Sequence, residues 1–310
     1  MKSILKKALF GIDHPKEYIC ASAGEISGGL NCYALVNGEK ILVTENLLFL
    51  GYRPLIMGWI TEKFDGKELT ISFERKDNAK IVAGLTLRLE KEIPLAEKTL
   101  FLFKGISSKQ QFESAFHQFM FKWYDRFRPK QAGNIDLDPA LYNEVKIAYS
   151  IPREIKLITL GNENDFNVFP TDLHGRAGNV EYIISLRHDK KACAQVMETG
   201  KLALWTVNAK HVAEIYALGK NHSRDLSAKE NHSFTTNQSP LFHFPEPFGA
   251  INCEELELQK TIADIGIHRI LLFKSNSGSA NSDPKRLVHL HRSYLQWHIK
   301  NGFAFTEAKR

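Results

Sequence analysis

The chain has 310 residues, of which 43% are apolar and 25% are charged, and its formal net charge is +6. This length predicts about two domains, and the composition lets each domain bury an apolar core. No stretch approaches the ~18–20 uninterrupted apolar residues that a membrane-spanning helix needs. The apolar stretches at the start are too short and too broken for a signal peptide. We therefore predict a cytoplasmic protein with no membrane-spanning segment.

The positive charge favours an anionic ligand, such as a cofactor that carries a phosphate group. The basic residues are scattered and form no block with interleaved aromatic residues, which argues against nucleic acid as a partner. The four cysteines are isolated from one another, so neither a zinc ribbon nor a dithiol redox site is predicted. A small molecule with a phosphate group is thus the ligand class that the composition fits best.

Residues 1–130 are predicted to form a β-rich domain closed by one amphipathic helix. Short apolar runs alternate with turn signals over residues 17–103, and the Asn37-Gly38 pair is a strong signal for a hairpin. Regularly spaced runs of this kind are typical of an antiparallel sheet or a small barrel. The sequence does not indicate the role of this domain.

A change of period marks the helix, which is predicted over residues 108–128 with Ser107 or Ser108 as its N-cap. Aromatic residues recur there at helical steps: Phe112, Phe116, Phe119, Trp123 and Phe127. We expect this aromatic stripe to pack against the preceding sheet. The alternative is that it fills a partner groove or forms an oligomer contact.

The polar residues 129–139 contain two prolines and a glycine, and they form the best candidate for a linker. After it, residues 140–310 are predicted to form a second domain in which strands alternate with helices. A long, polar, histidine-rich loop is expected over residues 221–247, because loops of that length are functional or disordered in compact domains.

One stretch of the second domain suits a phosphate group. A strand over residues 182–186 is followed by Arg187 and then by a helix predicted to end at Thr199-Gly200. Free backbone N–H groups at a helix start attract anions, and Arg187 and Lys191 add positive charge. The competing interpretation is that Asp189 caps the helix and that the charges form a solvated surface. The local sequence does not decide between these two.

A second polar loop, residues 167–175, precedes that strand. Thr171 could donate its hydroxyl to a phosphate, and the surrounding backbone could face the polar edge of a flavin ring. The simpler interpretation is an ordinary turn built on Pro170 and Asp172.

The order of these pieces resembles the flavin reductase-like family of FMN-binding split β-barrels over residues 147–297. The matching pieces are the strand at residues 152–159, Asn167 to Thr171, the strand at 182–186, Thr199-Gly200, Val207-Asn208, residues 219–225 and residues 287–294. The resemblance implies a C-terminal FMN-binding split barrel that forms a homodimer, with FMN near the dimer interface and NAD(P)H as co-substrate. Carried over by position, the flavin contacts would be Asn167, Thr171, Ser185, Arg187 and Lys191.

The reaction that the resemblance implies is hydride transfer from a reduced nicotinamide to flavin, for which no catalytic side chain is assigned. No Gly-x-Gly-x-x-Gly follows a strand, so a separate dinucleotide-binding domain is not predicted. The alternative function is a non-catalytic flavin- or haem-binding module whose N-terminal domain recruits a partner. His289 and His291 share one face of a strand and could contact haem with His298 or His243. We predict that they are structural and that no metal is bound.

Overall fold

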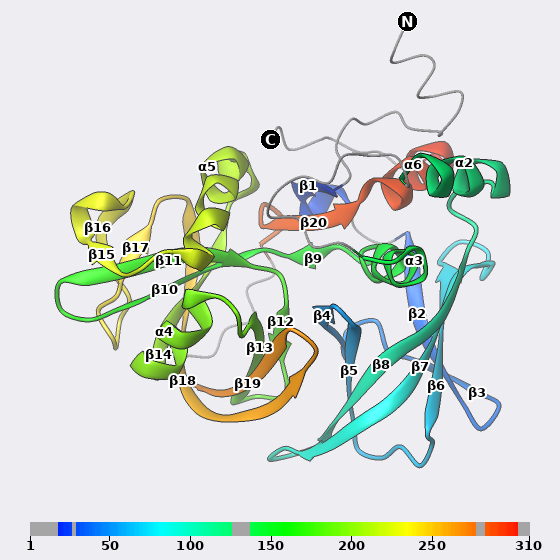
Figure 1. Cartoon of the computed structure of the whole chain (residues 1–310), viewed down its shortest axis with the longest axis horizontal. Coiled ribbons are helices and arrows are strands. Elements are labelled where there is room, and N and C mark those ends of the chain that lie inside the picture. The colour runs from blue at the N-terminus through cyan, green and yellow to red at the C-terminus, as the bar shows by residue number, and fades with distance from the viewer. Residues whose placement is uncertain (1–17, 27–28, 126–136, 277–282, 303–310) are drawn as a thin grey trace, which may run out of the picture.

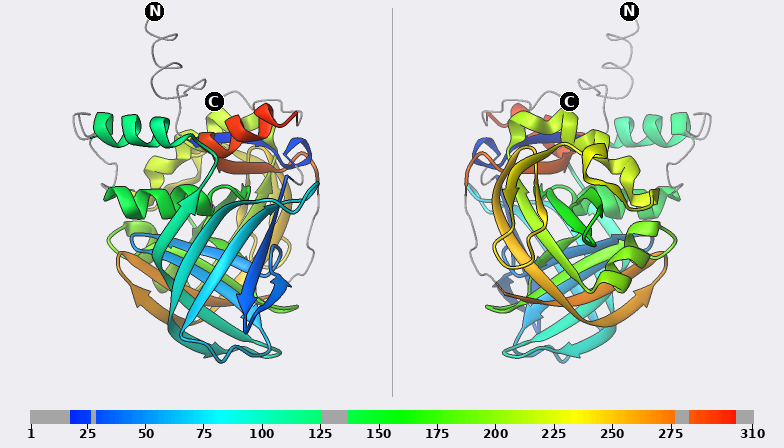
Figure 2. Two further views of the ribbon diagram at one scale, coloured as in Figure 1. Left: turned by 90° about the vertical axis from the view of Figure 1, so that its right-hand side faces the viewer. Right: turned by 90° about the vertical axis from the view of Figure 1, so that its left-hand side faces the viewer.

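The computed structural model describes residues 18–26, 29–125, 137–276 and 283–302. Antiparallel strands dominate the described chain, which confirms the mainly β class predicted from the sequence. Figure 1 shows two β bodies beside each other, one in blue to cyan and the other in green to orange, with helices above them. Figure 2 shows each body in turn as a curved sheet with strongly tilted strands. No helix in the described ranges is long and apolar enough to cross a membrane.

The first body is a seven-stranded antiparallel sheet with the order β3-β2-β6-β7-β8-β5-β4. Its strands are β2 (Leu30–Val36), β3 (Glu39–Leu42), β4 (Leu47–Tyr52), β5 (Leu55–Thr61), β6 (Glu68–Arg75), β7 (Ile81–Pro94) and β8 (Thr99–Gln110). The hairpin predicted at Asn37-Gly38 joins β2 to β3, with φ of 51° and 86° at these two residues. Asn and Gly adopt such positive φ angles readily, which is why this pair favours a tight hairpin.

The second body is an eight-stranded sheet with the order β12-β13-β19-β18-β14-β10-β11-β15. Its strands are β10 (Lys156–Gly161), β11 (Asp165–Thr171), β12 (His174–Arg176), β13 (Glu181–Arg187), β14 (Lys201–Val207), β15 (Ser227–Ala228), β18 (Ala250–Ile265) and β19 (His268–Ser275). Helix α4 (Lys191–Thr199) connects β13 to β14 and ends at Gly200, whose φ is 66°. This confirms the helix end predicted at Thr199-Gly200.

A long connection crosses from β14 to β18 and covers one side of the eight-stranded sheet. It contains η2 (Ala209–His211), α5 (Val212–Ala217), η3 (Leu218–Ser223), η4 (Lys229–Asn231) and the hairpin of β16 (Phe234–Gln238) with β17 (Pro245–Pro247). The sequence predicted one long polar loop over residues 221–247, and the structure has short ordered elements there instead. Apolar side chains explain the difference, because Phe234 packs on Phe166 and Phe244 is buried in the same core.

A small third sheet ties the two ends of the chain together. β20 (Leu287–His291) lies between β1 (Tyr18–Ser22) and β9 (Arg153–Glu154), and the short helix η1 (Ala23–Glu25) follows β1. Helix α6 (Arg292–Lys300) follows β20 directly, and the His291 side chain caps it by accepting from the Ser293 N–H. Helix α3 (Pro139–Ala148) follows the predicted linker and packs mainly on β8 of the seven-stranded sheet. Most of the predicted linker lies outside the described residues.

The helix predicted over residues 108–128 is shorter than expected. β8 continues to Gln110 because Ser107 and Ser108 pair with β7, so neither serine is an N-cap, and α2 (Ala115–Asp125) begins later. The expected packing of the aromatic stripe is also wrong. Of its described side chains only Phe112 is buried, against Tyr294 and Trp297. The exposed members are Phe116, Phe119 and Trp123.

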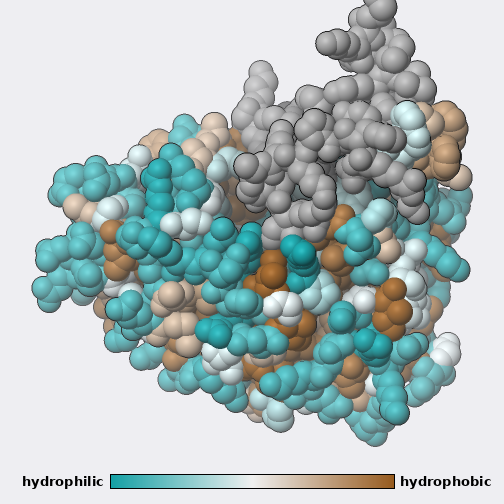
Figure 3. Space-filling model, viewed as in Figure 1, coloured by the Kyte–Doolittle hydropathy of each residue, from teal (hydrophilic) through white to brown (hydrophobic). Residues whose placement is uncertain are grey.

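The two large sheets share an apolar core. Side chains of β4, β5, β7 and β8 pack against side chains of β13, β18 and β19 and against Ala177. Figure 3 shows that the face of the molecule seen in Figure 1 is otherwise mostly hydrophilic, with apolar residues gathered toward its middle. The two bodies are therefore joined through buried apolar surface, which contributes roughly 25 cal/mol per Å² removed from water.

Candidate functional site

Asp172 lies at the centre of a hydrogen-bond network in the turn between β11 and β12. Its Oδ2 accepts a hydrogen bond from the Tyr149 hydroxyl at 2.8 Å and lies 2.8 Å from Nδ1 of His289. Nε2 of the same imidazole lies 3.0 Å from the Tyr216 hydroxyl. A carboxylate only accepts, so Nδ1 of His289 donates to Asp172. The network thus joins four side chains from separate elements.

The charge of Asp172 is stabilised although the residue is largely buried. Burial alone would raise the pKa of this carboxyl group, but hydrogen bonds from His289 and Tyr149 outweigh it and hold the pKa below its ordinary value. Burial and the neighbouring Asp172 carboxylate raise the pKa of Tyr149 well above its ordinary value. Tyr149 therefore stays a hydrogen-bond donor, and Asp172 stays an anion at neutral pH.

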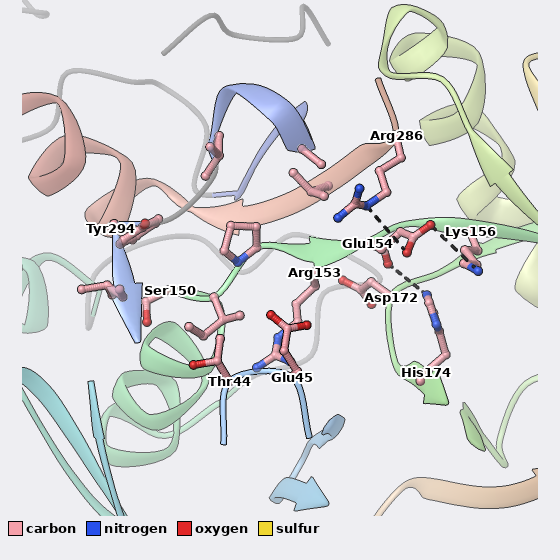
Figure 4. A pocket seen from close by; sticks show the side chains of 18 of the residues that line it. Thr44, Glu45, Ser150, Arg153, Glu154, Lys156, Asp172, His174, Arg286 and Tyr294 are labelled. Atoms are coloured by element: carbon pink, nitrogen blue, oxygen red, sulfur yellow. Dashed lines mark hydrogen bonds and ion pairs between the residues drawn. The ribbon is translucent and has the colours of Figure 1, made fainter. Parts of the chain in front are cut away.

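Two cavities meet at this turn. The smaller has a volume of about 190 Å³ and is lined by Ile155, Pro170, Thr171, Asp172, Ile215, Tyr216, Gly219 and His289. The larger has a volume of about 610 Å³, and Asp172 and His174 belong to its wall. Figure 4 shows the charged side chains around it, which come from the β3–β4 connection, from β9 and β10, from the β11–β12 turn, from β12 and from the residue before β20: Glu45, Arg153, Glu154, Lys156, Asp172, His174 and Arg286.

The wall of the larger cavity carries more basic than acidic side chains. Glu154 forms ion pairs with two basic residues of this wall. Lys156 Nζ lies 3.9 Å and Arg286 Nε 4.0 Å from the Glu154 carboxylate oxygens. Nε2 of His174 lies 3.0 Å from the Glu154 carbonyl oxygen. Burial, together with the nearby Lys156 charge, lowers the pKa of His174 to about 3, so this ring is neutral. The cavity suits a polar group with a partial or full negative charge.

The start of α4 is cationic, and no side chain caps it. Lys190 is the N-cap residue and makes no side-chain cap hydrogen bond, so Asp189 is not the cap. Asp189 instead forms a bidentate pair with Arg187, with distances of 2.9 and 2.5 Å. Lys191 Nζ lies 2.5 Å from Asp225 Oδ2. The first N–H groups of the helix thus remain open to an anion.

The five predicted site residues fall into two groups. Thr171 lines the smaller cavity, while Asn167 is buried and donates to Gln195 at 2.7 Å and to the Asn221 carbonyl oxygen at 3.1 Å. That bonding fixes η3 against β11, so the Asn167 amide nitrogen is already used within the protein.

The other three residues lie along β13 and the start of α4. Ser185 and Arg187 alternate with barrel-interior residues, so their side chains point to the opposite face, toward the seven-stranded sheet. The Ser185 hydroxyl is buried and has no hydrogen-bond partner. Lys191, in contrast, is half exposed at the first turn of α4.

His222 lies between the two groups, and no sequence motif had selected it. Its Nε2 lies 2.8 Å from the Pro170 carbonyl oxygen, and its ring packs on Phe169 at 4.8 Å. Burial lowers the pKa of His222, while Asp172 raises it and Arg187 and Lys190 lower it. The charges of the turn and of the helix start therefore act on one imidazole ring. Only the histidine-rich composition of the predicted loop hinted at it.

Tyr52 of the seven-stranded sheet also reaches this region. Its backbone N–H donates to Nε2 of His268 at 3.2 Å, and the two rings meet edge to face at 4.6 Å. Because His268 is the strand partner of Arg187, Tyr52 lies beside Arg187, whose charge opposes the rise that burial causes in the pKa of Tyr52. No sequence signal could reveal this contact, because the two residues lie in different sheets and far apart in the chain.

Two of the histidines considered for haem, His289 and His291, are engaged within the protein. His289 belongs to the Asp172 network. His291 lies 3.1 Å from the Tyr142 hydroxyl through Nε2 and accepts from the Ser293 N–H through Nδ1. Both rings therefore have structural partners, as predicted.

Comparison with solved structures finds flavin proteins that align with about half of the chain. The NADH:FAD oxidoreductase of Streptomyces globisporus is 12% identical, with a TM-score of 0.41 over 53% of this chain and 96% of its own. The flavin reductase component of a bacterial two-component tryptophan halogenase is 12% identical, with a TM-score of 0.40 over 48% of this chain and 98% of its own. An FMN-binding protein of Thermus thermophilus is 14% identical, with a TM-score of 0.38 over 48% of this chain and 78% of its own.

No family model and no curated protein sequence matches the chain. The three solved structures are flavin reductases or FMN-binding proteins, which is the group that the sequence resembles.

Proposed function

We propose that the chain binds FMN between the turn at residues 170–174 and the start of α4, and that it is an oxidoreductase of the flavin reductase kind that uses NAD(P)H. The observation that carries this proposal is that η3 contacts both parts: Nε2 of His222 lies 2.8 Å from the Pro170 carbonyl oxygen of the turn, and Gln195 of α4 donates to the Arg224 carbonyl oxygen, at the end of η3, at 2.9 Å. These contacts support one site that includes the polar turn and the cationic helix start. That site joins the two stretches from which a flavin was predicted.

The helix start suits the phosphate of FMN. Its N–H groups have no side-chain cap, and a guanidinium can bind phosphate bidentately. Arg187 and Lys191 now pair with Asp189 and Asp225, both of which are exposed. An exposed pair such as Lys191–Asp225 contributes only ~0–1 kcal/mol. A phosphate with a charge of about −1.5 to −2 can therefore compete for Lys191, and Arg187 has further N–H donors beside the two that bind Asp189.

Ser185 supports the fit. A buried hydroxyl without a partner is costly, by about 1–3 kcal/mol. The Ser185 hydroxyl is such a group, and it lies on the same strand face as Arg187. A phosphate oxygen at this place would give it an acceptor.

The opposite end of the site suits the flavin ring. When bound, FMN would supply the hydride-accepting chemistry. Thr171 and the turn backbone offer polar contacts for the ring edge, and Ile155 and Ile215 give the smaller cavity apolar walls. Asp172 orients His289, which in turn holds the Tyr216 hydroxyl at the cavity wall. The cytoplasmic location stays a prediction, and so does the homodimer, to which a monomer with two copies of the fold is the alternative.

The proposal is tested by titrating purified protein into FMN and following the quenching of flavin fluorescence. We expect Arg187→Ala to weaken FMN affinity about tenfold or more, because a charge-assisted hydrogen bond contributes ~1.5–3 kcal/mol. Arg269→Ala is the matched control, since Arg269 forms the same bidentate pair with Asp264, at 2.8 Å for both bonds. The control should bind FMN as the wild type does.

Each outcome decides something. An absence of quenching by the wild type would contradict the flavin proposal, and equal affinity in the two arginine variants would remove Arg187 from the site. Bleaching of the bound flavin by NAD(P)H would support the enzyme. Binding without bleaching would favour a non-catalytic flavin module. The exposed aromatic residues of α2 give such a module a surface for a partner: Phe116, Phe119 and Trp123.

A further inference from the structure

The two large sheets have the same topology. Read in chain order, β2 to β8 are the first to seventh strands of one sheet, and β10 to β14, β18 and β19 are the first to seventh strands of the other. Apart from the two-residue strand β15 that lies outside β11, both sheets run from one edge second, first, fifth, sixth, seventh, fourth, third. All neighbours are antiparallel in both. So irregular an order is not expected twice in one chain unless both sheets have one fold.

The two sheets differ mainly in their connections. The fourth and fifth strands of the later sheet are joined through α4, whereas β5 and β6 are joined by residues 62–67 without a helix. The fifth and sixth strands of the later sheet are separated by the long connection that carries η3 and His222. The short turn at residues 76–80 replaces that connection in the earlier sheet. Only the later sheet therefore has the parts of the candidate site.

The contacts between the sheets are reciprocal. The β4–β5 turn meets the β18–β19 turn, where the Ile267 N–H donates to the Arg53 carbonyl oxygen at 3.2 Å. The corresponding β12–β13 turn meets the β7–β8 turn, where the Asn179 amide donates to Glu97 Oε1 at 3.1 Å. Each sheet thus presents the same two turns to the other. This is the pattern of an isologous interface, which two copies of one fold form around a two-fold axis.

Both sheets also contribute side chains to the apolar part of the interface. Leu48 and Leu102 of the earlier sheet and Ile183 and Ile270 of the later one belong to a single buried cluster. The third strands, β4 and β12, meet at the centre, where a Cβ on Gly175 would lie 2.4 Å from Leu48 Cδ2. Nothing larger than glycine fits there without displacing the Leu48 side chain.

We propose that the chain contains two copies of one split-barrel fold, that the earlier copy takes the place of a partner subunit, and that its Tyr52 completes the phosphate site of the later copy. The identity of the ligand as FMN rests on the proposed function, and the duplicated fold does not. Tyr52 is a positioning residue, because it acts on the phosphate through Arg187.

The position of Tyr52 explains why there is one site per chain. Its ring packs edge to face on His268 at 4.6 Å, and His268 is the strand partner of Arg187 in the pairing of β13 with β19, beside the start of α4. At the other end of the interface, the turn at residues 177–180 reaches β7 and β8 of a copy that has no helix after its fourth strand. That end has no uncapped helix start and hence no equivalent anion site.

The test combines native mass with titrations of FMN, riboflavin and inorganic pyrophosphate. We expect a monomer that binds one FMN per chain. Tyr52→Phe should weaken FMN binding about threefold to tenfold, the effect of losing one ordinary hydrogen bond, and should leave riboflavin binding unchanged, since riboflavin has no phosphate. Asn179→Ala is the matched control, because it removes a side-chain contact at the opposite end of the interface. It should bind both flavins as the wild type does.

The outcomes separate the two proposals. Two outcomes would overturn the further inference and leave the proposed function standing. One is wild-type FMN binding with no selective loss in Tyr52→Phe, and the other is an obligate homodimer with flavin shared between chains. No FMN binding, but pyrophosphate binding that weakens in Tyr52→Phe, would overturn the flavin and support the anion site. Binding of neither ligand would overturn both. A thermal melt of each variant checks that it is folded.

Discussion

At the scale of single residues, a substitution of Ser185 should change FMN affinity without a comparable change in stability. Its hydroxyl is buried without a partner, so its removal costs the folded protein no hydrogen bond. We expect Ser185→Ala to change the free energy of unfolding by less than about 0.5 kcal/mol, or to stabilise the protein. FMN affinity should fall several-fold if the hydroxyl contacts the phosphate. Urea unfolding and fluorescence titration measure the two effects on one sample.

Thr159→Val is the control for this substitution. Thr159 carries another buried hydroxyl without a partner, on β10, and valine keeps the shape of its side chain. Its effect on stability should be similarly small, and FMN affinity should stay at the wild-type value. A clear loss of stability in Ser185→Ala would mean that the hydroxyl has a structural partner, and unchanged FMN affinity would place it outside the site.

Residues could be predicted where the site is built from one stretch of chain. Arg187 and Thr171 follow from local patterns, namely a strand that leads into a helix and a polar turn. Tyr52 and His222 could not be found in this way, because their roles depend on contacts with distant segments. Asn167 is the opposite case. The family motif predicts it as a flavin contact, but its amide nitrogen donates to the Asn221 carbonyl oxygen and holds η3.

At the scale of elements, the same distinction holds. The hairpin at Asn37-Gly38 and the end of α4 at Gly200 were predictable, because positive φ angles are local properties of these residues. The start of α2 was not predictable. Ser107 and Ser108 have ordinary helix-cap character, but their pairing with β7 extends the strand instead.

Helix α3 offers a prediction on pH dependence at the element scale. Glu144 lies on its face toward β8 and packs against Gly105. Burial, followed by repulsion from Asp138, raises the pKa of Glu144 from 4.5 to about 7. Between pH 4.5 and about pH 7, Glu144 therefore keeps its proton in the folded state and has lost it in the unfolded state. Stability decreases as the pH rises through that window, and the cost is complete above it.

We expect Glu144→Gln to stabilise the protein at pH 8 by on the order of 1–3 kcal/mol and to have no comparable effect at pH 4. Glu113→Gln should do the opposite at pH 8. Burial would raise the pKa of Glu113, but Lys146 and Ser293 outweigh it and lower that pKa, so its charge stabilises the fold. Urea unfolding of both variants at the two pH values measures this. Destabilisation by Glu144→Gln at pH 8 would contradict the predicted cost.

At the scale of the whole molecule, segments near the two ends of the described chain are joined by a strand pairing and by a shared apolar core. β1 pairs with β20, so the first and last described strands form one small sheet. One apolar core joins residues of the seven-stranded sheet to Val288, Leu290 and Leu295 near the C-terminal end. The division into residues 1–130 and 140–310 that the sequence favours does not capture these links. Pairing between strands so distant in sequence leaves no local signal.

This architecture predicts that the two sheets unfold together. Leu102 and Ile270 are fully buried in the shared apolar cluster, one from each sheet. We expect Leu102→Ala and Ile270→Ala each to cost about 2–5 kcal/mol, the usual loss for such a cavity. Each should lower hydrogen-exchange protection in both sheets by the same amount, because the two side chains belong to one apolar cluster that both sheets share. The exposed Leu241→Ala should change protection little. Loss of protection confined to the substituted sheet would show that the two copies fold independently and would remove the physical basis for a site that depends on both.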